Sequence, residues 1–173
     1  MKVDLRLMPY TLDDRDDALA AHERMMANEH PGFLRFIEDA PNWAGWVQIK
    51  NEVDLGKNLD LRAGVLATQL RAVVDPHIVG WVSVRFELSE AAFRIGGHIG
   101  YYVLHPYRGN GYDTVLLRQS LVIARSRSVG PLFIICDDDK VASAAVAERC
   151  GAVIDAVASN DDFDQAIRRY WFH

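Results

Sequence analysis

The residues Arg108-Gly109-Asn110-Gly111-Tyr112-Asp113 form a short segment whose residue types suit the binding of an anion. The residues Tyr101 to Val103 before it have the pattern of a strand, and those from about Thr114 onwards have the pattern of a helix. A loop that leads from a strand into a helix points unpaired backbone N–H groups and the positive end of the helix dipole at one spot. Arg108 adds a cation, and glycine lets a phosphate come close to the main chain. The segment therefore predicts a phosphate-binding loop.

Two well-known phosphate-loop patterns do not fit this segment. The Rossmann fingerprint needs a third glycine where the chain has Thr114, and no repeated βαβ units surround the loop. The Walker pattern needs a glycine followed by Lys and then Ser or Thr, which the chain lacks. The sequence therefore argues against a dinucleotide-binding domain and against a P-loop nucleotidase.

The hydrophobic pattern around the loop predicts a mixture of strands and helices. Alternating and short apolar runs predict strands at Val3–Met8, Val65–Val74, Ile78–Phe86, Phe93–Val103 and Leu132–Cys136, with one or two more from Val153-Ile154 and Ile167–Phe172. Helical spacing predicts helices over Asp13–Asn28, Thr114–Ser128 and Lys140–Arg149. The residues around Ser89 to Ala92 are expected to form a loop. The helix after the glycine loop is expected to bury Val115, Leu117, Leu121, Val122 and Ala124.

Composition sets limits on the partners of the chain. It has 173 residues, enough for one domain over residues 1–173, and a formal net charge of −5, which disfavours nucleic acid and anionic membranes as partners. The two cysteines, Cys136 and Cys150, are expected to be reduced thiols, and no signal peptide or membrane span is visible. We therefore expect a cytoplasmic location.

The second half of the chain resembles the GNAT superfamily of acyl-CoA N-acyltransferases. Arg108, Gly111 and Asp113 fall on the defining positions of the family's Arg/Gln-x-x-Gly-x-Gly/Ala pyrophosphate loop. The resemblance looks closest to a group of bacterial predicted acetyltransferases and covers roughly residues 65–173. Four further stretches carry it in the family's order: Ile78–Arg85, Arg94–Tyr101, Cys136–Ser143 and Arg168–Trp171.

The resemblance implies an α+β, three-layer fold with a mixed, mostly antiparallel sheet, flanking helices and a splayed central pair of strands. The splayed strands would be Tyr101–His105 and Leu132–Cys136, and the pantetheine arm of acetyl-CoA would lie between them. Backbone groups of the first strand would hold the pantetheine, and loop amides would hold the diphosphate. The expected acetyl-CoA-binding residues are Val103, Leu104, His105, Arg108, Gly109, Asn110, Gly111, Tyr112, Asp113, Lys140 and Ser143, and no metal site is expected.

The reaction expected from the resemblance is direct transfer of an acetyl group from acetyl-CoA to an amine. The amine must lose a proton, and His98 is the candidate base because its pKa suits the task and its strand faces the expected acceptor side. The alternative for His98 is a hydrogen-bonded residue of the sheet, and Glu87 and Glu90 are other candidate bases. Ala147 stands where many family members have a leaving-group tyrosine, so catalysis would rest on positioning and solvent.

Asp113 departs from the family's loop, which has glycine or alanine there. A carboxylate at this position either repels the diphosphate and competes for the loop amides, or turns outward and caps the helix. The first reading motivates a second hypothesis, a catalytically impaired GNAT-like binding or regulatory module with a weakened CoA site.

Two other features have ordinary structural explanations. Asp137-Asp138-Asp139 suits the start of a helix better than a metal site, and Cys136 suits the core better than a nucleophilic role.

The acceptor is expected to be a small-molecule amine or an amino group on a larger molecule. Its pocket is expected to come largely from residues 30–64, whose aromatic side chains either line a pocket or fill the core. The acidic charge balance counts against a toxin-like enzyme acting on charged tRNA. Homodimers are common in the superfamily, so a homodimer is also considered.

Overall fold

Two antiparallel sheets carry the fold of the computed structural model, which describes residues 4–27, 34, 40–54, 64–160 and 165–173. The larger sheet has the order β1-β2-β3-β4 and the smaller one the order β5-β7-β6. Their strands are β1 (Arg6–Met8), β2 (Ala67–Val74), β3 (His77–Arg85), β4 (Ile99–Val103), β5 (Leu132–Asp137), β6 (Val153–Asn160) and β7 (Gln165–Phe172). The α-helices are α1 (Arg15–Met26), α2 (Trp43–Asp54), α3 (Glu90–Ile95), α4 (Tyr112–Ser126) and α5 (Val141–Arg149), with short 3-10 turns at Leu12–Asp14 and His105–Tyr107.

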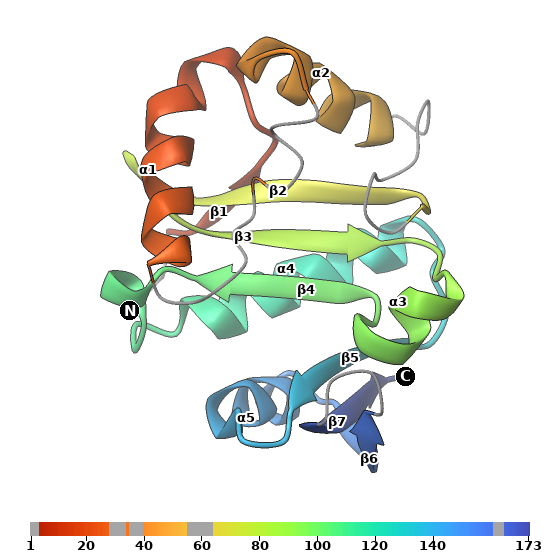
Figure 1. The fold of residues 1–173 in the computed structure, drawn as a ribbon. Coiled ribbons are helices and arrows are strands. Elements are labelled where there is room, and N and C mark those ends of the chain that lie inside the picture. The colour runs from red at the N-terminus through yellow and green to blue at the C-terminus, as the bar shows by residue number, and fades with distance from the viewer. Residues whose placement is uncertain (1–3, 28–33, 35–39, 55–63, 161–164) are drawn as a thin grey trace.

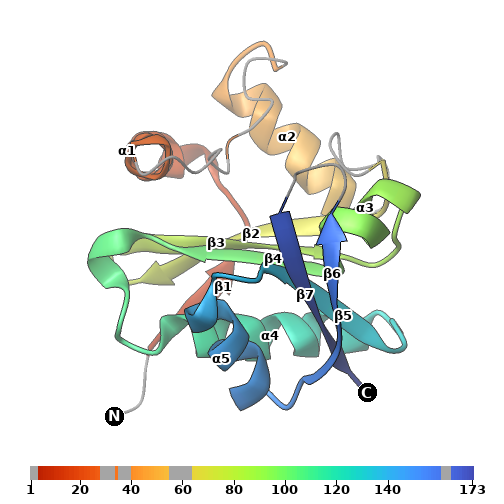
Figure 2. The same cartoon turned by 60° about the horizontal axis from the view of Figure 1, so that its bottom comes forward.

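The helices cover both sides of the sheets. Helices α1 and α2 lie on one side and α4 and α5 on the other (Figure 2). Trp46, Met25 and Leu104 belong to the core between the larger sheet and helices α1 and α2. Leu117, Ile134 and Tyr170 belong to the core between the sheets and helices α4 and α5. This mixed α+β arrangement of antiparallel sheets with flanking helices confirms the predicted fold class.

Helix α4 buries a face that differs slightly from the predicted one. Leu117, Leu121 and Ala124 are buried as expected, but Val122 is 68% exposed, and Leu116 and Ser120 are buried in addition. Ser120 is tolerated there because its hydroxyl donates to the Leu116 carbonyl at 2.7 Å. The predicted stripe was therefore rotated about the helix axis relative to the observed one.

The segment before β4 is a short helix where the sequence predicted a loop and the start of a strand. The Ser89 side chain accepts a hydrogen bond from the Ala92 N–H and caps α3, and Phe93 lies within that helix. The strand begins only at Ile99, after Gly96 and Gly97. The prediction of a strand from Phe93 was therefore wrong in its first half.

Strands β4 and β5 meet at only one end. Gly97, just before β4, pairs with Ile134 of β5, and the His98 N–H donates to the Phe133 carbonyl at 2.8 Å. No further pairing joins β4 to β5 in the described chain, so the two strands diverge from this point (Figure 1). We refer to the region between the two strands as the wedge.

Candidate functional site

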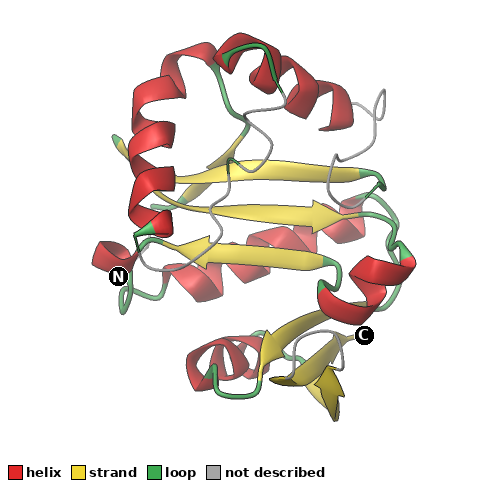
Figure 3. Ribbon diagram, in the orientation of Figure 1, coloured by secondary structure: helices red, strands yellow, loops and turns green. Residues whose placement is uncertain are grey.

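The connection between β4 and α4 presents a cluster of free backbone N–H groups. Gly109 and Gly111 adopt positive φ angles of 78° and 77°, which favour glycine. Within the described structure, the N–H groups of residues 109–113 have no backbone acceptor, and the N-terminus of α4 follows directly. Figure 3 draws the connection as a green loop that leads into α4. A Cβ added at either glycine would meet no atom within 4 Å, so there is open space beside both glycines. The arrangement suits an anion that approaches from outside.

Arg108 fixes the shape of this connection. Its Nε donates to the Val103 carbonyl at 3.0 Å, and its guanidinium lies over the Tyr102 ring, 4.9 Å from the ring centre. Asn110 donates through Nδ2 to the Tyr107 carbonyl at 3.0 Å. Arg108 therefore ties the loop to the end of β4 and Asn110 ties it to the 3-10 turn, and the positive charge of Arg108 stays beside the N–H cluster.

Asp113 stands in the first turn of α4, half-buried, next to the same cluster. Burial raises the pKa of its carboxyl, while its own backbone N–H and the Arg108 guanidinium lower it. The carboxylate therefore lies close enough to interact with one of the amides that the loop offers. This position is intermediate between the two sequence-based readings, because the carboxylate interacts with its own backbone N–H and also adds negative charge beside the N–H cluster.

The wedge-facing edge of β4 belongs to Tyr101 and Val103. The Leu104 N–H donates to the Val79 carbonyl of β3, and the His98 carbonyl accepts from the Arg85 N–H of β3. Between these two bonds, Gly100 and Tyr102 of β4 therefore point their backbone groups toward β3. The backbone groups of the odd-numbered residues consequently point away from β3. Because the Val103 carbonyl already accepts from Arg108, Tyr101 presents the larger share of the free edge.

The Tyr101 side chain was missed by the sequence analysis. Its hydroxyl oxygen is buried and has no hydrogen-bond partner of good geometry, although the Ser143 hydroxyl of α5 lies near enough to affect it. Burial, followed by the charge of Asp113, raises the pKa of this phenol, and Ser143 lowers it. Strand alternation could have placed Tyr101 on this face, but only the tertiary structure brings α5 beside it.

His98 lies at the closed end of the wedge. Its side chain is buried, and its Nδ1 accepts a hydrogen bond from the Phe133 N–H at 3.2 Å. Burial lowers the pKa of His98, which keeps the ring neutral. The lone pair that would take a proton from an amine is thus engaged by the backbone of β5.

The remaining predicted coenzyme-binding residues divide into two groups. His105 and Tyr112 flank the loop, since His105 begins the 3-10 turn after β4 and Tyr112 is the first residue of α4. Lys140 and Ser143 come from the start of α5, where Lys140 is exposed with its Nζ 4.0 Å from Asp139. The structure thus places the first group at the N–H cluster, whereas Ser143 lies beside Tyr101.

The cysteine and aspartate features have structural roles. Burial raises the pKa of the Cys136 thiol to about 11, so the thiol is protonated at neutral pH. Asp138 accepts a hydrogen bond from Arg168 Nε at 2.6 Å. The described residues contain no group of three or more metal-ligating side chains and no helix long and apolar enough to cross a membrane.

Much of the expected acceptor region lies outside the described residues. Of residues 30–64, the structure describes Leu34, 40–54 and Gly64. Trp43 and Trp46 of α2 stack at 5.0 Å and are buried, which places them in the core rather than on a pocket wall. Phe33, Phe36 and Ile37 lie outside the described residues.

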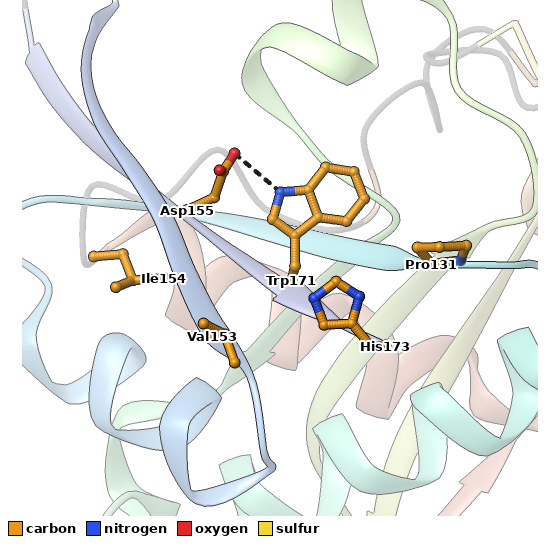
Figure 4. A pocket seen from close by; sticks show the side chains of 6 residues that line it. All are labelled: Pro131, Val153, Ile154, Asp155, Trp171 and His173. Carbon is orange, nitrogen blue, oxygen red and sulfur yellow. Dashed lines mark hydrogen bonds between the residues drawn. The ribbon is translucent and has the colours of Figure 1, made fainter.

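A pocket of about 400 Å³ opens at the end of the smaller sheet where β5 begins and β7 ends. The Trp171 indole N–H donates to Asp155 at 3.1 Å and forms one wall (Figure 4). Pro131, Val153, Ile154 and His173 complete the lining. The pocket is separate from the N–H cluster and contains none of the predicted site residues.

Comparison with known proteins identifies a family. Residues 4–153 match the family model described as "Acetyltransferase (GNAT) domain". No curated protein matches the chain.

Solved structures show the same fold at low sequence identity. The microcin C7 self-immunity acetyltransferase MccE, solved with acetyl-CoA and AMP, is 19% identical with a TM-score of 0.65, and the alignment covers 99% of this chain and 93% of MccE. The ribosomal L7/L12 alpha-N-protein acetyltransferase RimL, solved with coenzyme A, is 16% identical with a TM-score of 0.65 over 99% and 94% of the two chains. A Vibrio cholerae protein proposed to be a ribosomal-protein-serine acetyltransferase is 18% identical with a TM-score of 0.60 over 99% of each chain.

Proposed function

Because the chain belongs to the GNAT acetyltransferase family, we propose that it transfers an acetyl group from acetyl-CoA to an amine by direct attack. One observation supports this most directly. The free N–H cluster of the β4–α4 loop lies at the open end of a wedge between two strands that are paired only at their other end. An extended ligand with a diphosphate at one end matches that combination.

The residues of the wedge fit the arm of coenzyme A. Tyr101 and Val103 offer edge groups to the amides of a pantetheine, as a neighbouring strand would. The N–H groups of residues 109–113 and Arg108 fit a diphosphate. The Tyr101 phenol is protonated at neutral pH, so its O–H can donate a hydrogen bond to a carbonyl or to a departing thiolate.

The acceptor must reach the wedge as a neutral amine. Holding the two reactants together accounts for several kcal/mol of the barrier in such reactions. His98 remains the candidate base from the sequence, and its bond to Phe133 supports the alternative of a structural histidine. The acceptor class proposed here is a small-molecule amine or an amino group of a larger molecule, with no metal and no nucleic acid required.

The test of this function is a titration of the protein with acetyl-CoA, followed by a screen of amines for release of free thiol. We expect saturable binding with measurable heat and a rise in melting temperature. We also expect thiol release that depends on both the amine and the protein. Absence of binding at millimolar acetyl-CoA would contradict the proposal.

His98 gives a second prediction, because its two readings differ in one variant. His98→Asn removes the imidazole but keeps an oxygen that can accept the Phe133 N–H. We expect this variant to keep most of the activity and stability, whereas His98→Ala loses about 1–3 kcal/mol of stability through the unpaired Phe133 N–H.

The pH dependence of kcat/KM provides the matching measurement. If His98 is the base, kcat/KM of the wild type falls as the pH drops through its pKa, which burial holds below 6.5, and this acidic limb disappears in His98→Asn together with most of the rate. A folded His98→Asn variant that has lost turnover would establish the base role.

One observation favours the second candidate function, a binding or regulatory module with a weakened CoA site. Asp113 lies at the N–H cluster and adds a charge of the same sign as the diphosphate. A protein that binds acetyl-CoA weakly and acetylates none of the amines tested would support this candidate.

A further inference from the structure

Arg169 of β7 is held on an aromatic platform. Its guanidinium carbon lies 5.0 Å from the centre of the Phe93 ring and 5.2 Å from that of Phe133. Phe93 is 45% exposed on α3, whereas Phe133 is fully buried in β5, so the guanidinium stands at the boundary between core and solvent. Two rings fix its position while leaving its N–H groups unused.

No carboxylate or carbonyl satisfies this guanidinium in the described structure. Its Nε is buried and has no hydrogen-bond partner, and no ion pair with a described carboxylate is formed. The other half-buried arginines of the described chain differ from it. Arg71 pairs with Asp14 at 2.9 Å, Arg85 donates to the Gly97 carbonyl at 2.8 Å, and Arg168 pairs with Asp138 at 2.6 Å. Among these four half-buried arginines, Arg169 alone has neither a carboxylate nor a carbonyl partner in the described structure.

The position of Arg169 relates it to the wedge. Gly97 and Ile134 form the bridge at which β4 and β5 separate. The residue after Ile134 in β5 is Ile135, and Ile135 is paired with Arg169 of β7. The guanidinium lies on the same face of the smaller sheet as the Phe133 side chain. Ile134 and Tyr170 lie on the opposite face of that sheet, where they pack against α4 and α5. Arg169 is therefore level with the point where the wedge opens, on the side away from α4 and α5.

We propose that Arg169 binds a carboxylate of the acceptor, so that the acceptor is an amine that carries a carboxylate, such as an amino acid or a peptide with a nearby acidic group. The planar guanidinium offers paired N–H donors that match the two oxygens of a carboxylate. Because Arg169 carries a single positive charge, it matches the single negative charge of a carboxylate. This inference rests on the proposed acetyl transfer and specifies its substrate class.

The experiment compares amino acids with their carboxamides as acceptors, using kcat/KM from thiol release with acetyl-CoA. Because an acid and its amide also differ in the pKa of the amine, the ratio within each pair is compared between the wild type and the variants, and ethanolamine with phosphoethanolamine forms a parallel pair. We expect the carboxylate-to-carboxamide ratio of kcat/KM to be at least tenfold higher in the wild type than in Arg169→Gln, which loses activity mainly on the carboxylates. Arg169→Lys keeps the charge without the planar donors and is expected to give an intermediate ratio.

The matched control is Arg94→Gln, which removes an exposed arginine from α3 beside Phe93 and should leave the ratio as in the wild type. Equal carboxylate preference in wild type and Arg169→Gln, with both folded, would overturn the proposal, as would a preference confined to the phosphorylated acceptor.

A second measurement separates this inference from the proposed function. Calorimetry with N-acetyl amino acids and their amides, in the presence of coenzyme A, measures carboxylate binding without turnover. Carboxylate-selective binding that is lost in Arg169→Gln supports the inference even if no transfer is seen. Failure to bind acetyl-CoA at all contradicts the proposed function and, with it, the inference.

Discussion

Replacing Asp113 by alanine is expected to tighten coenzyme A binding by about one to two powers of ten. The carboxylate lies at the N–H cluster, where it adds negative charge and interacts with its own backbone N–H. Like charges ~6 Å apart at an effective dielectric constant near 20 repel by roughly 2 to 3 kcal/mol, which converts to that range of affinity. Isothermal titration of the wild type and Asp113→Ala with coenzyme A measures the change.

Asp113→Asn serves as the matched variant, because it removes the charge but keeps an oxygen that can accept the amide. A gain in both variants assigns the effect to charge repulsion. A gain in Asp113→Ala alone assigns it to competition for the amide. Unchanged affinity in both would show that the carboxylate acts only as a helix cap and that the loop binds at full strength.

The pH dependence gives an independent check on Asp113. Burial raises the pKa of its carboxyl above the usual value of 3.8, so the group gains its proton at a higher pH than an exposed aspartate. Protonation removes the repulsion, and coenzyme A affinity of the wild type relative to Asp113→Asn should therefore rise as the pH falls toward the pKa. Comparing the two proteins cancels the titration of the coenzyme's own phosphates.

Gly97→Ala is expected to destabilise the protein by about 2–4 kcal/mol and to abolish coenzyme A binding where the protein still folds. Gly97 has a φ of +63°, a conformation that side chains disfavour. A Cβ at this position would lie 2.7 Å from the Phe133 carbonyl, which is backbone and cannot move aside independently. The substitution therefore acts on the bridge that sets where β4 and β5 separate. Urea denaturation and calorimetry measure the two effects.

Gly100→Ala is the matched control, since Gly100 lies in β4 itself, and an added Cβ would meet nothing within 4 Å. Its expected change in stability is below about 1 kcal/mol. Equal stability of the two variants would show that the conformation at Gly97 is not required for the junction between the sheets.

Local patterns predicted most of the elements. The helix after the glycine loop was predicted from its apolar spacing, although Val122 is exposed, because several apolar stripes fit a helix as rich in aliphatic residues as α4. Helix α3 was missed because a six-residue helix shows little periodicity, and its start is fixed by the Ser89 cap. The glycines before Ile99 were correctly interpreted as a weak point of the strand.

The candidate site could be predicted only where its residues are adjacent in the sequence. The loop from Arg108 to Asp113 is continuous, so its spacing indicated anion binding directly. Tyr101 and Arg169 escaped because their significance depends on long-range neighbours, namely Ser143 for the first and Phe93 with Phe133 for the second. Periodicity assigns such a residue to a face of a strand, but it cannot assign the neighbour from a distant segment.

Because β4 and β5 are bridged at one end only, we expect the width of the wedge between them to depend on how helices α4 and α5 pack against each other. Helix α4 follows β4 and α5 follows β5, and they touch where the Arg118 guanidinium donates to the Arg149 carbonyl at 3.4 Å and the Cys150 thiol donates to the Thr114 carbonyl at 3.7 Å. Larger side chains at this contact would move the two helices apart and widen the wedge, and smaller side chains would narrow it. We therefore expect substitutions at the contact between α4 and α5 to change which acyl chain lengths the wedge accepts.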